Sequence, residues 1–212
     1  MARIVIVDYG MGNLASVRNA LRAVGFEAAV SDDPAAVAGA DGLVLPGVGA
    51  FGTGMQNLAR RGLDQAVRQA AAAGRPVLGI CLGMQLLLAE GDEGGPRPGL
   101  GLLEGRVARL PDGLPLPQIG WNLVEPQRDH PLFAGLPTPF WAYFDHAYAV
   151  EGEPPSTALA LTDYGRTYPS VVGRGNLLGI QFHPEKSSRA GLRMLANWGR
   201  MVCDLISTRP ST

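Results

Sequence analysis

The chain has very few cysteines. Of its 212 residues only Cys81 and Cys203 carry a thiol, and they are far apart. We therefore expect no disulfide framework and a reducing compartment, the cytoplasm. No apolar run approaches the roughly 20 residues that a membrane-spanning helix requires. The opening residues also lack the charged, apolar and small-residue segments of a signal peptide, so we expect neither secretion nor a membrane partner.

An excess of charge of either sign is missing as well. Lys and Arg number 18 against 19 Asp and Glu, the formal net charge is -1, and no basic run occurs. Nucleic acids and anionic membranes are bound through basic surfaces, so we expect neither as a main partner. The hydrophobic fraction of 46% allows a substantial core. The length favours one domain, which we expect to span residues 1–212.

Short apolar runs alternate with helical patterns in the first half of the chain. Apolar residues recur at steps of three and four from Leu14 to Val24. Strands are predicted at Arg3–Asp8, Glu27–Val30, Gly42–Leu45 and Pro76–Ile80. Helices are predicted at 14–24, at Pro34–Ala38, at Thr53–Ala73 with an interruption or bend near Gly62, and at Leu82–Glu90. This alternation predicts an α/β fold whose central, mostly parallel sheet has helices on both faces.

The second half has a different pattern. Gly91–Gly99 is polar and rich in glycine and proline, so we expect a loop there. Strands separated by proline-containing turns are predicted at Gly105–Leu110, Trp121–Glu125, Phe140–Val150, Thr157–Thr162 and Asn176–Phe182. A helix is expected at Ser188–Val202. We expect these strands to be antiparallel additions to the same sheet.

Cys81 lies where an apolar strand meets a helix, with Gly79 two residues before it and Gly83 two residues after. This spacing is typical of a nucleophile elbow, a tight turn that points the nucleophile away from the sheet. The new helix's N-terminus favours a thiolate, and the N–H of Leu82 can stabilise an oxyanion. A buried structural cysteine is the alternative, because free cysteine is among the most buried residue types.

A thiolate nucleophile needs a base, usually histidine, and a group that orients the base. His130 lies in a polar turn, where we expect it to be solvated, and His146 lies in a strand, where we expect a satisfied buried or interface histidine. His183 directly follows an apolar strand, and open α/β sheets place their sites at strand C-terminal ends. Glu185 can hold one imidazole nitrogen and direct the other to sulfur. Cys81, His183 and Glu185 are thus a candidate triad.

A second glycine-rich turn follows the strand at Gly42–Leu45. Gly47 and Gly49 allow backbone N–H groups to turn inward, as an oxyanion hole requires. An ordinary βα turn is the alternative.

These three motifs together resemble the class I, or triad, glutamine amidotransferases. They are Pro46-Gly47-x-Gly49, Gly79-x-Cys81-x-Gly83-x-Gln85 and His183-Pro184-Glu185, in this order and over essentially the whole chain. The segments DYGMGNL (8–14), GWN (120–122) and HPEKSS (183–188) are similar to the members that serve histidine biosynthesis. The resemblance implies a flavodoxin-like class I amidotransferase fold and an enzyme that hydrolyses glutamine without cofactor or metal.

The resemblance also implies roles for individual residues. Cys81 would attack the glutamine side-chain amide, and His183, held by Glu185, would move the proton. The oxyanion hole would comprise Val48, Leu82 and Gly49. The residues implied in glutamine binding are Gln85, Gly47, Gly83, Ala147 and Tyr148. Ammonia would pass to a (β/α)8-barrel cyclase subunit in a heterodimer, and the residues implied at that interface or along the ammonia route are Tyr143, Trp121, Lys186 and Asn13.

The chain departs from the family around His146. Members usually have an apolar residue before this histidine and Ser or Thr after it, whereas this chain has Asp145 and Ala147. Backbone contacts to glutamine at these positions would leave binding unchanged. A needed hydroxyl would alter glutamine affinity or signalling from the partner.

Three alternatives stay open. Gly10-Met11-Gly12-Asn13-Leu14-Ala15 fits the dinucleotide-binding pattern, with Asp32 where a ribose carboxylate would lie. A catalytically silent subunit could keep the fold, although the complete triad argues against it. The amidotransferases of anthranilate, aminodeoxychorismate, guanylate or pyridoxal phosphate synthesis are the alternatives within the enzyme class.

Overall fold

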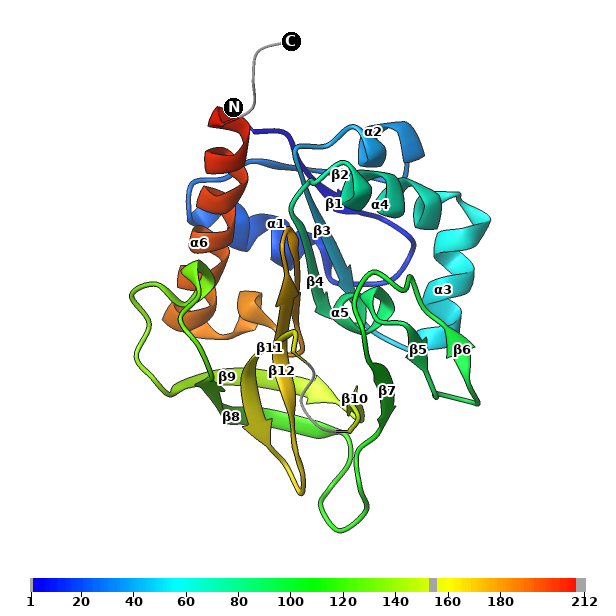
Figure 1. Ribbon diagram of the computed structural model, residues 1–212, viewed down its shortest axis with the longest axis vertical. Helices are drawn as coiled ribbons and strands as arrows, with labels where there is room; N and C mark the ends of the chain where they lie inside the picture. The colour runs from blue at the N-terminus through cyan, green and yellow to red at the C-terminus, as the bar shows by residue number, and fades with distance from the viewer. Residues whose placement is uncertain (1, 153–155, 209–212) are drawn as a thin grey trace.

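A nine-stranded sheet forms the centre of the protein. The computed structural model describes residues 2–152 and 156–208 (Figure 1). The strand order is β2-β1-β3-β4-β13-β12-β11-β8-β9. The parallel part contains β1 (Ile4–Val7), β2 (Ala28–Ser31), β3 (Gly42–Gly47), β4 (Val77–Cys81) and β13 (Leu177–Ile180). The predicted parallel sheet is therefore confirmed.

Helices cover both faces of this sheet, as predicted. In Figure 1, α1 (Leu14–Ala23) and α6 (Ser188–Ser207) lie on one side, and α2 (Pro34–Ala38), α3 (Phe51–Arg60) and α4 (Leu63–Ala72) lie on the other. Side chains alternate between the faces along a strand. Ile4 and Ile6 of β1 accordingly join the core beside α1 and α6, whereas Val5 and Val7 join the core beside α3 and α4. Burial on both faces explains why β1 is wholly apolar.

The interruption or bend predicted near Gly62 is a break between α3 and α4. Gly62 has φ 69°, in the left-handed region that glycine adopts without steric cost. At the other end of the chain, α6 ends at Ser207, five residues beyond the predicted Val202. None of the helices in residues 2–152 and 156–208 combines the length and apolarity needed to cross a membrane.

Antiparallel strands extend the sheet beyond β13, as predicted. They are β12 (Thr167–Arg174), β11 (Ala158–Asp163), β8 (Gln118–Pro126) and β9 (Phe140–His146). β12 was not predicted from the sequence, because Thr167, Pro169 and Ser170 interrupt its apolar pattern. Its pairing with β13 and β11 supplies the hydrogen bonds that local propensity does not indicate.

A second sheet overturns three local predictions. Its strands, in the order β10-β7-β5-β6, are β5 (Glu90–Gly91), β6 (Arg97–Pro98), β7 (Arg106–Arg109) and β10 (Tyr148–Val150). The helix predicted to reach Glu90 ends as α5 (Leu82–Leu87), and the predicted 91–99 loop contains a short hairpin. The predicted strand 140–150 divides at Ala147 between the two sheets. The expectation that all late strands join one sheet was wrong, because long-range pairing determined these segments.

Candidate active site

A pocket of about 370 Å³ opens at the carboxyl ends of neighbouring parallel strands. Residues 48–50 after β3, Cys81 at the end of β4, and Leu82 and Gln85 of α5 form one wall, the nucleophile wall. Glu93, Pro117 and residues 145–148 form the facing wall. His183 lies three residues beyond β13, the other neighbour of β4. The position agrees with the general rule for sites in open α/β sheets.

Cys81 occupies the predicted turn from strand to helix. Its backbone has φ 53° and ψ -112°, a conformation that costs a non-glycine residue about 1–3 kcal/mol. A Cβ on Gly79 would lie 2.7 Å from the Gly83 backbone, and a Cβ on Gly83 would collide with the Leu45 carbonyl oxygen. Both flanking glycines are therefore required by close packing around the turn.

The Cys81 thiol is buried among polar groups. Its Sγ lies 3.9 Å from the Asp145 carbonyl oxygen, to which the thiol donates, and 3.8 Å from the side-chain nitrogen of Gln181, which donates to sulfur. The side chain also lines the pocket. A nucleophile that is held on the protein side and reachable from the pocket suits covalent catalysis.

His183 and Glu185 form a buried pair beside this cysteine. His183 Nδ1 lies 2.9 Å from Glu185 Oε1, and the two side chains are only 3% and 2% exposed. Burial lowers the pKa of His183, but the Cys81 sulfur and the Glu185 carboxylate raise it more, to about 10. Within the described residues His183 Nε2 has no hydrogen-bond partner. The pair can thus hold an imidazolium next to a thiolate.

The turn that carries His183 is tied to β9. The 3-10 turn η2 (Pro184–Lys186) follows His183, whose N–H donates to the Tyr143 carbonyl at 2.9 Å. The buried Ser187 hydroxyl donates to the His183 carbonyl at 2.6 Å and accepts from the Tyr143 N–H at 2.9 Å. Ser187 belongs to a motif noted in the sequence, but no role was predicted for it.

The three predicted oxyanion-hole residues line the pocket, whereas two glycines beside them do not. Val48, Gly49 and Leu82 line the pocket next to Cys81, and Gly49 has φ 105°. Gly47 and Gly83 do not belong to the lining. A Cβ on Gly47 would collide with the Tyr9 hydroxyl and one on Gly83 with Leu45, so both serve close packing of β3 against α5.

Gln85 lines the pocket, together with Ala147 and Tyr148. Its side-chain nitrogen is already used within the protein, since it donates to the Tyr148 carbonyl at 2.9 Å and to Gln181 Oε1 at 3.2 Å. Gln85 therefore connects the nucleophile wall of the pocket with the facing wall.

Glu93 was not predicted as a site residue, because residues 91–99 were expected to form a loop. Its carboxylate accepts from the Phe51 N–H at 2.7 Å, and the residue lines the pocket. A carboxylate there can bind a substrate ammonium group. In the sequence, Glu93 is one acidic residue a few positions after the helix that follows Cys81. Such residues are too common to identify a site residue.

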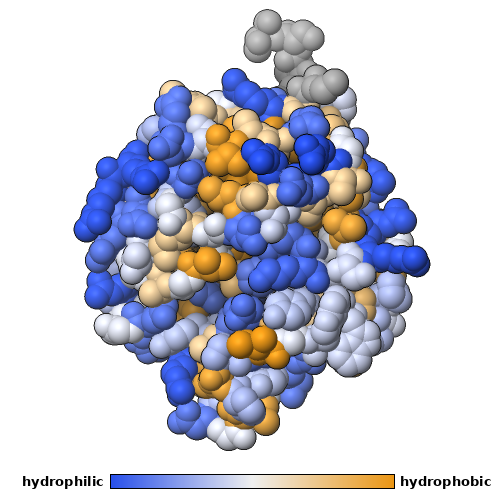
Figure 2. Space-filling model, turned by 180° about the vertical axis from the view of Figure 1, so that it is seen from behind, coloured by the Kyte–Doolittle hydropathy of each residue, from blue (hydrophilic) through white to orange (hydrophobic). Residues whose placement is uncertain are grey.

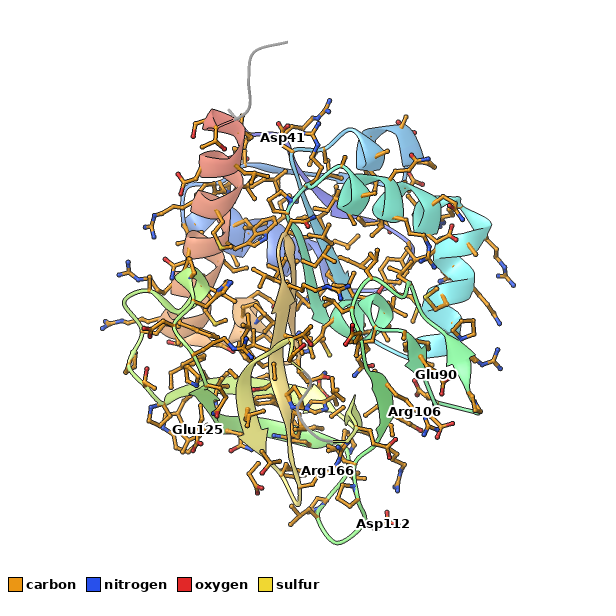
Figure 3. All side chains as sticks on the ribbon, viewed as in Figure 1. Asp41, Glu90, Arg106, Asp112, Glu125 and Arg166 are labelled. Carbon is orange, nitrogen blue, oxygen red and sulfur yellow. The ribbon has the colours of Figure 1, made fainter. Side chains whose placement is uncertain are left out.

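One arginine makes three ion pairs within the small sheet, which contains Tyr148 and, in the turn between β5 and β6, Glu93. Arg106 lies 3.0 Å from Glu90, 2.7 Å from Asp92 and 3.2 Å from Glu151. Figure 3 shows Arg106 and Glu90 on this sheet, away from α6. These ion pairs join β5, β7 and the end of β10 beside the pocket.

The other two histidines have structural partners. His146 is buried, with Nδ1 2.8 Å from the Tyr148 carbonyl and Nε2 3.2 Å from the Tyr168 hydroxyl, so the prediction of a satisfied buried histidine is confirmed. Burial lowers its pKa to about 4, helped by the charges of His183 and Arg166 and opposed by the Tyr148 hydrogen bond. His130 is half-buried and accepts from the Leu132 N–H, so the prediction of a solvated side chain was wrong.

Three of the predicted interface residues lie together on the outer face of β8 and β9. The Trp121 and Tyr143 rings meet edge to face at 6.2 Å, and Lys186 Nζ lies 5.5 Å from the Tyr143 ring centre. Ile119 and Trp141, for which no role was predicted, are also more than half exposed. Separate apolar patches also interrupt the hydrophilic surface seen from behind (Figure 2). Asn13 instead caps α1, accepting from the Ser16 N–H at 3.3 Å.

Comparisons with known proteins match nearly the whole chain to one protein family. The family described as "Glutamine amidotransferase class-I" matches residues 5–201. "Imidazole glycerol phosphate synthase subunit HisH" of Moorella thermoacetica is 48% identical, over 95% of this chain and 96% of its own length. The protein of the same description from Aquifex aeolicus is 47% identical, over 93% and 96%.

A solved structure shows the same fold at low identity. The crystal structure of a glutamine amidotransferase from Thermotoga maritima aligns with a TM-score of 0.64 and 19% identity, over 99% of this chain and 86% of its own.

Asp32 is the carboxylate that the dinucleotide-binding alternative assigns to a ribose. Its side chain is exposed and pairs with Arg61 at 3.3 Å.

Proposed function

The chain belongs to the class I glutamine amidotransferase family, and on this premise we propose that it is the glutaminase subunit of an imidazole glycerol phosphate synthase. One observation carries the chemistry: the buried His183–Glu185 pair stands beside a strained cysteine that lines a pocket. A catalytically silent subunit would have no need of that arrangement.

The reaction proceeds through a thioester. The Cys81 thiolate attacks the side-chain carbonyl carbon of glutamine, forming a carbon–sulfur bond and an oxyanion near the N–H groups of Val48, Gly49 and Leu82. His183 gives its proton to the leaving nitrogen, and ammonia departs. His183 then takes a proton from water, whose oxygen attacks the thioester and releases glutamate. The carbon–sulfur bond breaks and the thiolate–imidazolium pair is restored.

Glutamine binds across the two walls of the pocket. Glu93 pairs with the α-ammonium group of the substrate, because its carboxylate is held in the lining by the Phe51 N–H. Gln85, Ala147 and Tyr148 contact the substrate beside Cys81. If residues 145–148 contact glutamine through backbone atoms, Ala147 in place of the usual Ser or Thr leaves glutamine binding unchanged. Gly47 and Gly83 support this wall by close packing.

A (β/α)8-barrel cyclase subunit binds the outer face of β8 and β9 and receives the ammonia. The exposed Ile119, Trp121 and Trp141, with Lys186 over Tyr143, make this the aromatic face that we assign to the partner. Asn13, which caps α1, is also assigned to the partner interface or the ammonia route. The chain acts as one domain, in the cytoplasm.

The test is glutamate release from glutamine by the purified chain, alone and with the barrel cyclase plus its nucleotide ligand. We expect turnover that rises strongly with the partner and vanishes in Cys81→Ala. Ammonia-driven cyclisation by the Cys81→Ala complex should survive, which controls for assembly.

Other outcomes would correct the proposal. Turnover without partner dependence would keep the glutaminase and reject the pathway, pointing to another amidotransferase. No turnover from a well-formed wild-type complex would support the silent subunit.

A further inference from the structure

Gln181 is a fully buried polar side chain that the reaction described above does not use. It lies one residue beyond β13 and two residues before His183. Burying an amide is unfavourable unless its hydrogen-bonding groups have partners. Both ends of this side chain do have partners, and one of them is the Cys81 sulfur.

The hydrogen bonds fix which end of the amide faces sulfur. The Tyr148 carbonyl can only accept, so the Gln85 side chain must present its NH2 group there, at 2.9 Å. The same NH2 group donates to Gln181 Oε1 at 3.2 Å. With its oxygen so occupied, Gln181 directs its own NH2 group at Cys81 Sγ, 3.8 Å away.

We propose that Gln181 is a catalytic residue whose side-chain NH2 group donates to the Cys81 sulfur and stabilises the thiolate. The inference rests on the proposed thiolate chemistry. The thiol donates to the Asp145 carbonyl, and that bond is lost when the proton leaves, whereas a donor such as Gln181 is strengthened.

The same donor acts at both ends of the catalytic cycle. Negative charge resides on sulfur before attack and again when the thioester is cleaved, so a fixed N–H lowers the energy of the nucleophile and of the leaving group. The contact is long with the neutral thiol, and catalytic hydrogen bonds commonly shorten as the reaction proceeds. Gln85 orients Gln181 and, through the Tyr148 carbonyl, links the facing wall to the nucleophile.

The test measures Cys81 itself and not glutamine turnover. The complex with the cyclase subunit is alkylated with iodoacetamide across a pH series, and mass spectrometry quantifies the Cys81 and Cys203 peptides separately. Wild type is compared with Gln181→Met, which removes the donor at similar length, and Gln181→Glu, which replaces the donor with a carboxylate. Cys203, exposed on α6, is the internal control in every sample.

We expect the pH at half-maximal alkylation of Cys81 to rise by about one unit in Gln181→Met and further in Gln181→Glu, with Cys203 unchanged. Glutaminase kcat should fall by about tenfold or more, with the KM for glutamine within about threefold. Circular dichroism and ammonia-driven cyclisation check that each variant folds and assembles.

An unchanged Cys81 profile in either folded variant would overturn the proposal. If Gln181→Met fails to fold, Gln181→Glu, which keeps the shape of the side chain, decides alone. If both fail to fold, Gln181 is a structural residue and the proposal is rejected. A wild-type complex that alkylates normally but releases no glutamate would instead reject the proposed function.

Discussion

The two walls of the pocket are built in different ways. The nucleophile wall consists of short turns after β3 and β4, close-packed through glycines and containing a strained backbone at Cys81. The facing wall comes from the small sheet and the end of β9, joined by long-range strand pairing and by the ion pairs of Arg106. The first is rigid by packing, and the second depends on partly exposed charges. Chemistry should therefore be sensitive to the first wall and substrate binding to the second.

The largest effect is expected at Glu185, which holds the base His183 beside Cys81. Glu185→Gln keeps the size of the side chain but no longer fixes the tautomer of His183. Glutaminase kcat should fall by about a thousandfold or more, with little change in the KM for glutamine. Steady-state kinetics of the complex provide the measurement, and ammonia-driven cyclisation serves as the assembly control. A loss below about tenfold would mean that Glu185 is only a packing partner.

A smaller effect, on stability, is expected from His146, which lies at the edge of the facing wall. Its pKa is about 4 when folded against an ordinary value of 6.5, so between these pH values the unfolded chain binds a proton that the folded chain does not. The free energy of unfolding should therefore fall as the pH falls through this window, by up to about 3 kcal/mol.

Urea unfolding at pH 7 and pH 4.5 would test this loss, with His146→Gln expected to reduce it. His183 contributes equally to both proteins, because its raised pKa gives stability that is complete below pH 6.5 and is lost toward pH 10, and pH 7 lies at the start of that range for wild type and variant alike. An identical pH dependence in wild type and variant would contradict the prediction.

Ser187 joins the His183 turn to β9, so its removal should loosen the contact between the walls. Ser187→Ala leaves the Tyr143 N–H without its partner and should lower glutaminase kcat by about tenfold. Ser188→Ala is the matched control, because Ser188 is the exposed neighbour. Equal rates in the two variants would show that the Ser187 hydroxyl does not position His183.

The smallest effect is expected at Arg106, on the facing wall. Arg106→Met should raise the KM for glutamine by about threefold to tenfold and leave kcat nearly unchanged, because partly exposed ion pairs contribute about 1 kcal/mol or less each. Arg109→Met, on the same strand, removes only the pair with Asp112 and should change neither constant. A fall in kcat alone for Arg106→Met would break the distinction between the walls.

The sequence predicts the nucleophile wall better than the facing wall. The alternation of strands and helices, the break at Gly62 and the turn at Cys81 are local patterns, and the structure confirms them. Glu93, β12 and the split at Ala147 depend on pairing between distant segments. No local pattern indicated that residues 90–98 form a hairpin beside the pocket, because strands of two residues have no periodicity to detect.

Because Cys81 has φ 53°, folding stability and catalysis favour different residues at this position. Glycine would occupy that backbone conformation at lower cost, so mutation toward stability leads directly away from a nucleophile. A lineage released from glutamine hydrolysis would gain folding free energy by accepting glycine there. Cys81 thus carries a backbone cost that glycine would avoid, and only the chemistry of its sulfur offsets that cost.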